Sequence, residues 1–193
     1  AEVTDDVWRQ AMSNGLPYFM AQDRLAGLML ADPMPITAAD MELAAALGVS
    51  STGRAFSDGR EALEILCQEI EERVSQGYGV LEKGAPRVLT VVHSLSDPTI
   101  ANMMMDVGLA ACATIFSVQP ARQEGRHIKY TTLGERRADW VMRDALFHSS
   151  FGVVKRCEGA VKALDMDGIV WGYLYNCRPA SILSHMVKKY IEE

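Results

Sequence analysis

The chain has 193 residues, of which 49% are hydrophobic and 23% charged, and its formal net charge is −6. This balance is typical of a globular protein with one sizeable core, and the lack of a basic cluster argues against nucleic-acid binding. No apolar run approaches the length of a membrane span, and the first residues resemble no secretion signal, so we expect a cytoplasmic protein that binds no membrane.

Residues 1 to 84 are predicted to form a helical segment. Thr4 is a suitable cap for a first helix that ends at Asn14-Gly15, since glycine commonly follows a helix. A second helix is predicted from about residue 17 to 31, and the prolines of the segment 32–35 end it.

Two more helices are predicted in this segment. Thr37 begins one that ends at Gly48. Ser57 or Asp58 caps the other, which is the clearest helix of the chain. Its apolar residues recur at intervals of three and four, as in a helix with one buried face; they are Leu63, Leu66, Cys67, Ile70 and Val74.

From residue 85 to 193 the pattern predicts strands alternating with helices. The strands are expected at 87–92, 112–118 and 168–174, and the helices at about 98–107, 135–147, 153–164 and from Pro179 to the end of the chain. The first strand, the next helix and the second strand span about thirty residues, as a parallel pair with a right-handed crossover requires.

The predicted fold class is therefore α/β: a three-layer, Rossmann- or flavodoxin-like parallel sheet that follows an N-terminal helical segment. Three strands are fewer than the four to six or so that are usual, so we expect the domain to be incomplete. Periodicity predicts buried faces for two of its helices, namely Ile100, Met103, Met104 and Val107 in one and Ile182, Leu183, Met186, Val187 and Tyr190 in the other.

Four cysteines are present, at 67, 112, 157 and 177, without CxxC spacing. Their wide separation favours reduced thiols over a disulfide framework. Three of them belong to apolar stretches and are predicted to pack as small hydrophobic residues. Cys177 differs, because it follows a predicted strand and precedes a helix that Arg178-Pro179 begins.

Polar residues follow each predicted strand, and in a parallel sheet such residues converge on the edge where ligands bind. They are His93, Ser94 and Ser96 after the first strand, Ser117 and Gln119 after the second, and Tyr175, Asn176, Cys177 and Arg178 after the third. Cys177 is the candidate for chemistry here, because a helix N-terminus and Arg178 both favour a thiolate.

Four interpretations of Cys177 stay open on the residues alone. It is a nucleophile with His93 as its base, an iron–sulfur ligand, a zinc ligand, or a thiol that packs beneath a helix. An iron–sulfur cluster needs three or four ligands, and no second cysteine is predicted at this edge. The scattered cysteines and histidines have no zinc-finger or HExxH spacing, so packing is the simplest interpretation.

Several motifs together resemble the second domain of the 2-hydroxyacyl-CoA dehydratase / benzoyl-CoA reductase family. They are Arg87-Val88-Leu89-Thr90, a helix start containing Pro98, Gly108 before the second strand, Arg156, Asp167-Gly168-Ile169-Val170 and Asn176-Cys177-Arg178. The resemblance covers most of residues 55 to 193, and the last two motifs are its most specific part.

The resemblance implies flavodoxin-like lobes and a [4Fe–4S] cluster in which Cys177 is the ligand from the second domain. It also implies a related second subunit, an ATP-dependent iron–sulfur activator, and either radical dehydration of an (R)-2-hydroxyacyl-CoA or reduction of an aromatic acyl-CoA ring. The family's other two cluster cysteines have no counterpart here, so we expect a fragment that builds no stable cluster alone. His93, Ser94, Asn176 and Arg178 are candidates for contacts with the acyl-CoA. The alternative is a flavodoxin-like binding module without catalysis of its own.

Overall fold

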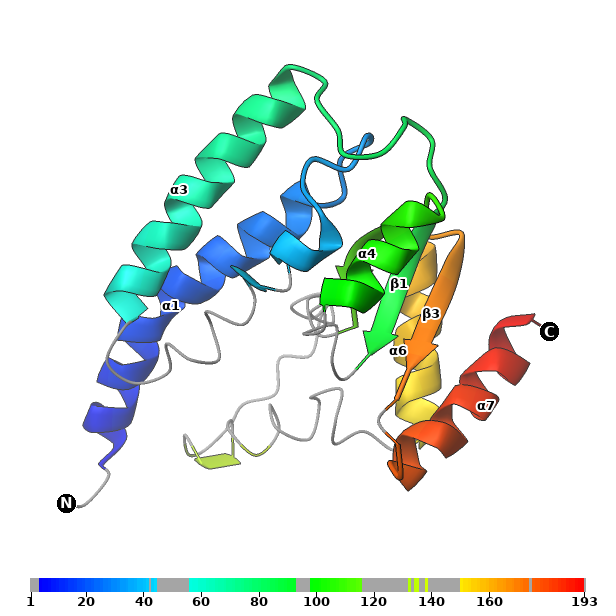
Figure 1. Cartoon of the computed structure of the whole chain (residues 1–193). Helices are drawn as coiled ribbons and strands as arrows, with labels where there is room; N and C mark the ends of the chain where they lie inside the picture. The colour runs from blue at the N-terminus through cyan, green and yellow to red at the C-terminus, as the bar shows by residue number, and fades with distance from the viewer. Residues whose placement is uncertain are drawn as a thin grey trace.

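The computed structural model describes residues 4–41, 43–44, 56–92, 98–115, 132, 134–135, 138, 150–173 and 175–192. Two long helices come first, and strands then alternate with helices, as predicted (Figure 1). The elements are α1 (Asp5–Leu28), α3 (Phe56–Ser75), β1 (Arg87–Val92), α4 (Pro98–Asp106), β2 (Ala110–Thr114), α6 (Ser150–Ala163), β3 (Gly168–Gly172) and α7 (Arg178–Glu192).

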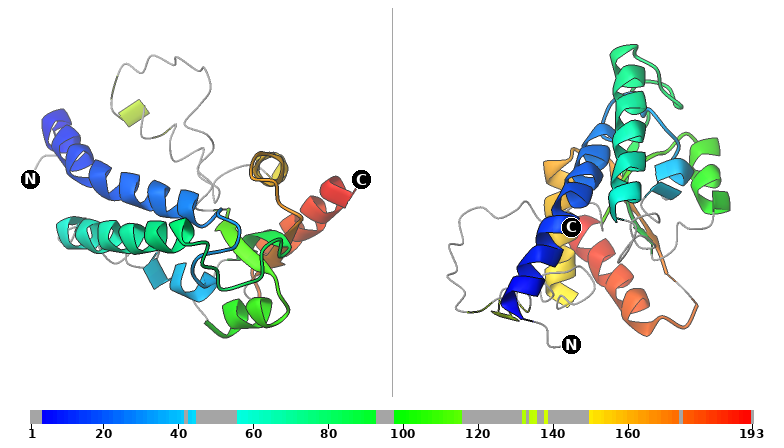
Figure 2. Two further views of the ribbon diagram at one scale, coloured as in Figure 1. Left: turned by 90° about the horizontal axis from the view of Figure 1, so that it is seen from above. Right: turned by 90° about the vertical axis from the view of Figure 1, so that its left-hand side faces the viewer.

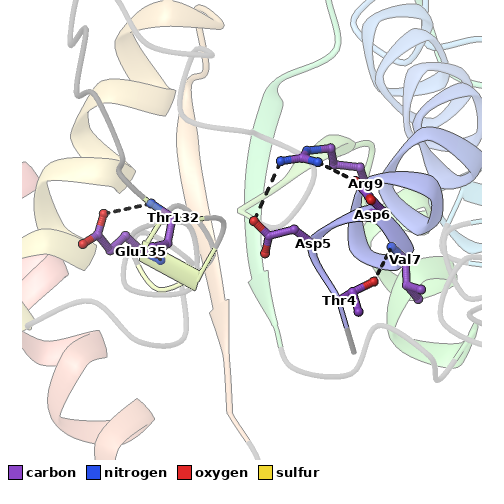
Figure 3. A network of polar contacts seen from close by, with 7 residues as sticks. All are labelled: Thr4, Asp5, Asp6, Val7, Arg9, Thr132 and Glu135. Atoms are coloured by element: carbon purple, nitrogen blue, oxygen red, sulfur yellow. Dashed lines mark hydrogen bonds and ion pairs between the residues drawn. The ribbon is translucent and has the colours of Figure 1, made fainter. Parts of the chain in front are cut away.

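Helix α1 begins at the predicted cap. The Thr4 hydroxyl oxygen accepts a hydrogen bond from the Val7 N–H at 3.4 Å, and Arg9 pairs with Asp5 and Asp6 in the first turn (Figure 3). Acidic side chains at a helix start also interact favourably with the helix dipole.

The predicted break between the first two helices is wrong, because α1 runs through Gly15 and Pro17 without interruption. Continuing the helix costs about 1 kcal/mol for glycine and about 3 kcal/mol for proline relative to alanine. Burial of the face that carries Tyr18, Ala21 and Leu25 offsets this cost. Tertiary packing has therefore overridden the local stop signal.

Helices α1 and α3 lie side by side, as both views of Figure 2 show. Leu63, Cys67 and Ile70 of α3 are buried against α1, in agreement with the predicted apolar face. Val74 was predicted on the same face but is exposed, because α3 ends one residue later. The helix begins at Phe56, so Ser57 and Asp58 lie in its first turn and the predicted cap is wrong.

Two capping arrangements mark other helix starts. The Thr37 hydroxyl oxygen accepts from the Asp40 N–H at 3.0 Å, where the third helix was predicted to begin, and residues 38–41 and 43–44 are helical. Thr132 and Glu135 exchange two backbone-to-side-chain hydrogen bonds, of 3.1 and 3.3 Å (Figure 3). Most of the helix predicted at 135–147 lies outside the described residues.

The sheet has the order β2-β1-β3, and both strand pairs are parallel, as predicted. Its central strand is β1, whose residues Val88 to Val92 pair in unbroken register with Gly168 to Gly172 of β3. Three strand bounds differ from the prediction: β2 starts at Ala110 rather than Cys112 and ends at Thr114 rather than at residue 118, and β3 ends at Gly172 rather than at residue 174.

Helices cover the sheet on both sides. Val88 packs with Ala101 and Met104 of α4 on one face. The adjacent residue, Leu89, belongs to the core cluster that contains Cys157 of α6, and successive residues of a strand point to opposite faces. The described chain is therefore a three-layer α/β structure with a small flavodoxin-like parallel sheet. The same core cluster includes residues of α1 and α3.

Five residues that periodicity placed inward are exposed: Ile100 and Met103 of α4, Val107 directly after α4, and Ile182 and Tyr190 of α7. Each helix buries only a narrow stripe, represented by Met104 in α4 and Val187 in α7. Figure 1 shows α7 beside β3 rather than over the centre of the sheet. Among the described helices, none is long and apolar enough to cross a membrane.

Candidate functional site

The carboxyl ends of the three strands meet at one edge of the sheet, because all three are parallel. From β1 the chain moves to β2 on one side, and β3 then pairs with β1 on the other side. Strand order thus reverses between β1 and β3, and ligands of open α/β sheets bind outside the carboxyl ends at such a point. The residues that follow β3 are therefore the candidate ligand-binding site of this sheet.

The connection from β3 to α7 is a short turn that carries several exposed side chains. Tyr173 is exposed, and Tyr175 is 94% exposed. Asn176 has a left-handed backbone with φ of 68°. Cys177 is half-buried, and Arg178 is exposed as the first residue of α7.

Hydrogen bonds define how this turn enters the helix. The Arg178 N–H donates to the Asn176 carbonyl at 3.0 Å, and the Ser181 N–H donates to the Cys177 carbonyl at 3.1 Å. Cys177 is therefore the residue whose carbonyl accepts the first helical hydrogen bond of α7. Cys177 thus stands at the N-terminal end of α7, where the helix dipole is positive.

Three of the five predicted site residues, Asn176, Cys177 and Arg178, are brought together in this turn. The other two, His93 and Ser94, fall in the segment 93–97, which the structure does not describe, and the same holds for Ser96, Ser117 and Gln119. His185, the histidine of α7, is exposed in the second turn of the helix.

Arg156 of α6 is one of the residues that carry the resemblance, but no role was predicted for it. One of its guanidinium nitrogens donates to the carbonyl of Ile115 at 3.2 Å, directly after β2. This bond holds a positive charge beside the carboxyl end of β2, whereas the turn that carries Cys177 follows β3 on the other side of β1. The sequence does contain a sign of this role, because Arg156 directly precedes the buried Cys157 on a face of α6 that is otherwise apolar.

The other three cysteines are sealed in the core, as predicted. Burial raises the pKa of the Cys157 thiol to about 11 and also raises the pKa of Cys67 and Cys112. A buried neutral thiol is a poor nucleophile and a poor ligand, since the thiolate is the reactive form. Within the described residues, Cys177 is thus the thiol best placed to react or to bind a metal.

The donor set of the described residues does not by itself fit an iron–sulfur cluster. Such a cluster needs three or four ligands, and the turn after β3 supplies one thiol. Nor does any group of three His, Cys, Asp or Glu side chains in the described ranges lie close enough to hold a metal ion. The remaining ligands would have to come from elsewhere.

The fold and this edge together define a class: an α/β protein with a flavodoxin-like sheet whose carboxyl edge carries one half-buried thiol at a helix N-terminus. No protein-family model matches the chain, and no curated protein matches it significantly.

Proposed function

We propose that the chain is a component of an iron–sulfur acyl-CoA enzyme, either a 2-hydroxyacyl-CoA dehydratase or a related benzoyl-CoA reductase. In this proposal Cys177 is the ligand that this α/β unit contributes to a [4Fe–4S] cluster. The support is the sequence resemblance together with one structural observation: the Cys177 thiol is half-buried at the carboxyl edge beside β3, whereas the other three thiols are enclosed in the core.

The cluster would supply one-electron chemistry, and this chain's residues would position it and the substrate. Arg178 is exposed beside Cys177 and is suited to an anionic group of an acyl-CoA. His93, Ser94 and Asn176 remain proposed contacts for the same substrate. A related second subunit and an ATP-dependent iron–sulfur activator complete the proposal, because the family's chemistry requires both.

Anaerobic reconstitution with iron and sulfide tests the ligand assignment in the polypeptide at its natural length. The wild type is expected to develop the brown chromophore and, after reduction, the electron-spin signal of a [4Fe–4S] cluster. Cys177→Ala should lose most of both signals. Cys67→Ala is the matched control, since it removes a thiol that is buried between α1 and α3 and should keep the signals. A Cys177→Ala protein with the full chromophore would exclude Cys177 as a ligand.

The alternative is a flavodoxin-like binding or interaction module without catalysis. It is favoured by the single thiol of the turn after β3 and by the lack of a metal-binding group among the described side chains. The module predicts acyl-CoA binding, measured by calorimetry, in a protein that takes up no iron at its natural length. Iron uptake that depends on Cys177 would reject the module.

A further inference from the structure

The sheet has two edge strands, and they differ in how well they are covered. β2 is buried along its whole length, whereas every residue of β3 (Gly168–Gly172) is only partly buried. No described strand pairs with β3 on the side away from β1. Figure 1 shows β3 at the margin of the sheet, next to α7. One edge of the described sheet therefore has room for another strand.

β3 lacks the features that usually keep an edge strand from pairing with another chain. It contains no charged residue and no proline. Its register with β1 runs without a bulge from Gly168 to Gly172. Helix α7 packs with α6 over one face of the sheet, so it supplies no strand partner at the edge. The edge of β3 is thus apolar, regular and unprotected.

The hydrogen bonds of β1 show which of its residues face β3. The Thr90 carbonyl accepts from the Ile115 N–H at 2.9 Å, on the side of β2. Successive residues of a strand direct their N–H and C=O groups to opposite sides, so the preceding residue, Leu89, bonds toward β3.

The same reasoning identifies the backbone groups of β3 that point away from the sheet. Leu89 is level with Ile169. In a parallel pair such a residue bonds to the two neighbours of its partner, which are Gly168 and Val170. The N–H and C=O groups of Ile169 therefore point outward, and by alternation so do those of Trp171. These groups are available to a further strand.

The sequence of β3, Gly-Ile-Val-Trp-Gly, matches itself when two copies run antiparallel. If Val170 of both copies lies at a two-fold axis, the end residues Gly168 and Gly172 of opposite copies face each other. Ile169 of one copy then lies opposite Trp171 of the other. Both direct their N–H and C=O groups outward, as a hydrogen-bonded antiparallel pair requires. A β-branched residue opposite an aromatic one also stabilises such a pair.

This arrangement keeps every side chain on the face that it already occupies. Ile169 and Trp171 pack against the core cluster on the α6 side, and Val170 packs against the cluster on the α4 side. A two-fold axis perpendicular to the sheet preserves both faces, so the layers of the two copies continue into one another. Leu183 and Met186 of α7, on the α6 side, are also only partly buried and add apolar area near this edge.

We propose that the free edge of β3 binds β3 of a second copy of this chain, antiparallel and centred on Val170. The two sheets then form one continuous sheet. The occupant is a second copy because the strand complements itself in both side chains and outward hydrogen-bonding groups. The assembly stops at two copies, since the other edge strand, β2, is already buried. The contact goes beyond the proposed function, because it needs neither iron nor an acyl-CoA.

A disulfide at the two-fold axis tests the contact directly. At the centre of this register the two Val170 Cα atoms are a non-hydrogen-bonded pair about 4.5 Å apart, a separation that a disulfide spans. The polypeptide at its natural length is used without iron, with Cys177→Ser to remove the half-buried thiol. Val170→Cys is expected to give a disulfide-linked dimer under mild oxidation, seen on a non-reducing gel.

Val107→Cys in the same background is the matched control, since position 107 is 72% exposed. Random collisions would link this more accessible thiol at least as fast as the one at position 170. We expect Val170→Cys to link about tenfold faster than Val107→Cys, because the contact holds its two thiols together. Equal rates, or faster linkage at position 107, would overturn the proposal.

Charge substitutions at Val170 test the symmetry in solution, by sedimentation equilibrium over a range of protein concentrations. The wild type should be a dimer. Val170→Lys and Val170→Glu should each raise the dimer dissociation constant about tenfold or more, because like charges meet at the axis. An equimolar mixture of the two variants should restore the dimer, since each lysine then faces a glutamate.

Three results would overturn the proposal: a monomeric wild type, an assembly larger than a dimer, or a dimer that neither charge weakens. A mixture that stays monomeric would also overturn it. Circular dichroism checks that each variant is folded. If a charged variant does not fold, the disulfide test decides alone, because cysteine is close to valine in size and apolar character.

Discussion

The carboxylate of Asp167 accepts a hydrogen bond from the Arg87 N–H at 2.7 Å, and the Asp167 N–H donates to the Arg87 carbonyl at 2.8 Å. This exchange joins the start of β1 to the residue that precedes β3. Five consecutive residue pairs follow in register, up to Val92 and Gly172. The carboxyl ends of the two strands are therefore level, which determines where the turn that carries Cys177 leaves the sheet.

Replacing Asp167 by alanine should lower the free energy of unfolding by about 1 kcal/mol, because the Arg87 N–H loses its acceptor. Urea denaturation measures the change. Asp167→Asn is the matched control, since its amide oxygen still accepts the hydrogen bond, and it should retain most of the stability. Equal losses in the two variants would show that charge, rather than the hydrogen bond, matters at this position.

Gly79→Ala should destabilise the fold, since a Cβ there would lie 2.2 Å from Cβ of Pro33. The two loops also share a hydrogen bond from the Val80 N–H to the Met34 carbonyl at 2.8 Å, so relief would require moving the backbone. We expect a loss of about 1–3 kcal/mol, as for other overpacked sites. Thermal or urea unfolding measures it.

Gly27→Ala is the contrasting variant, because no atom beyond the neighbouring backbone of α1 lies within 4 Å of a Cβ at that site. There the substitution should stabilise the protein by about 0.5–1 kcal/mol, the usual gain when alanine replaces glycine within a helix. A loss at Gly27 equal to that at Gly79 would mean that steric overlap with Pro33 is not the cause.

Local sequence signals predicted the order and type of the elements well. The β-branched run of β1, the proline at the start of α4 and the strand–helix–strand spacing led to a parallel sheet, which the structure confirms. These signals succeed because they reflect backbone preferences of the residues themselves. The continuous course of α1 through Gly15 and Pro17 depends on packing against α3, a contact that periodicity within α1 does not encode.

The exposure of helix side chains was predicted less well, because it too depends on packing against other parts of the chain. A helical period shows which residues share a face, but cover for that face comes from distant parts of the chain. Val107 belongs to the apolar set predicted for the helix at 98–107, but it follows the end of α4 and is 72% exposed. At the candidate site, the position of Cys177 followed from strand and proline signals. The left-handed backbone of Asn176 did not, because asparagine tolerates that conformation without requiring it.

The four thiols should differ sharply in reactivity. In the folded protein at pH 8, iodoacetamide should modify Cys177 well before Cys67, Cys112 or Cys157, and all four should react in denaturant. Burial explains the difference: it raises the pKa of the Cys157 thiol to about 11, so this group is neutral and enclosed. Peptide mass spectrometry identifies the modified sites, and modification of folded Cys157 at the rate of Cys177 would contradict the burial argument.

The raised pKa of Cys157 also predicts how stability depends on pH. In the unfolded chain the thiol ionises near its ordinary value of about 9, whereas in the folded chain it stays protonated up to about 11. The unfolded state therefore releases its proton first, and the contribution of this group to stability is complete below pH 9 and falls as the pH rises toward 11. Cys157→Ser would alter this slope, measured by urea unfolding at several pH values.

Glu158 on α6 should stay ionised in unusually acidic solution. Its carboxylate accepts hydrogen bonds of 2.8 Å from both Lys155 and Lys162, which lower its pKa from about 4.5 to about 2. Because the folded-state pKa is the lower one, the contribution of this group to stability is present above about pH 4.5 and is lost as the pH falls through 2. The pairs lie on the surface, so salt should weaken the effect.

Titration of the Glu158 carboxyl carbon by NMR measures this pKa directly. Replacing both Lys155 and Lys162 by methionine should return the pKa toward its ordinary value, because the two hydrogen bonds and both positive charges are removed together. Lys188→Met removes one exposed charge from α7 and serves as the control, since that lysine makes no described contact with Glu158. A pKa near 2 in the double variant would require another source of stabilisation for the carboxylate, such as the dipole of α6.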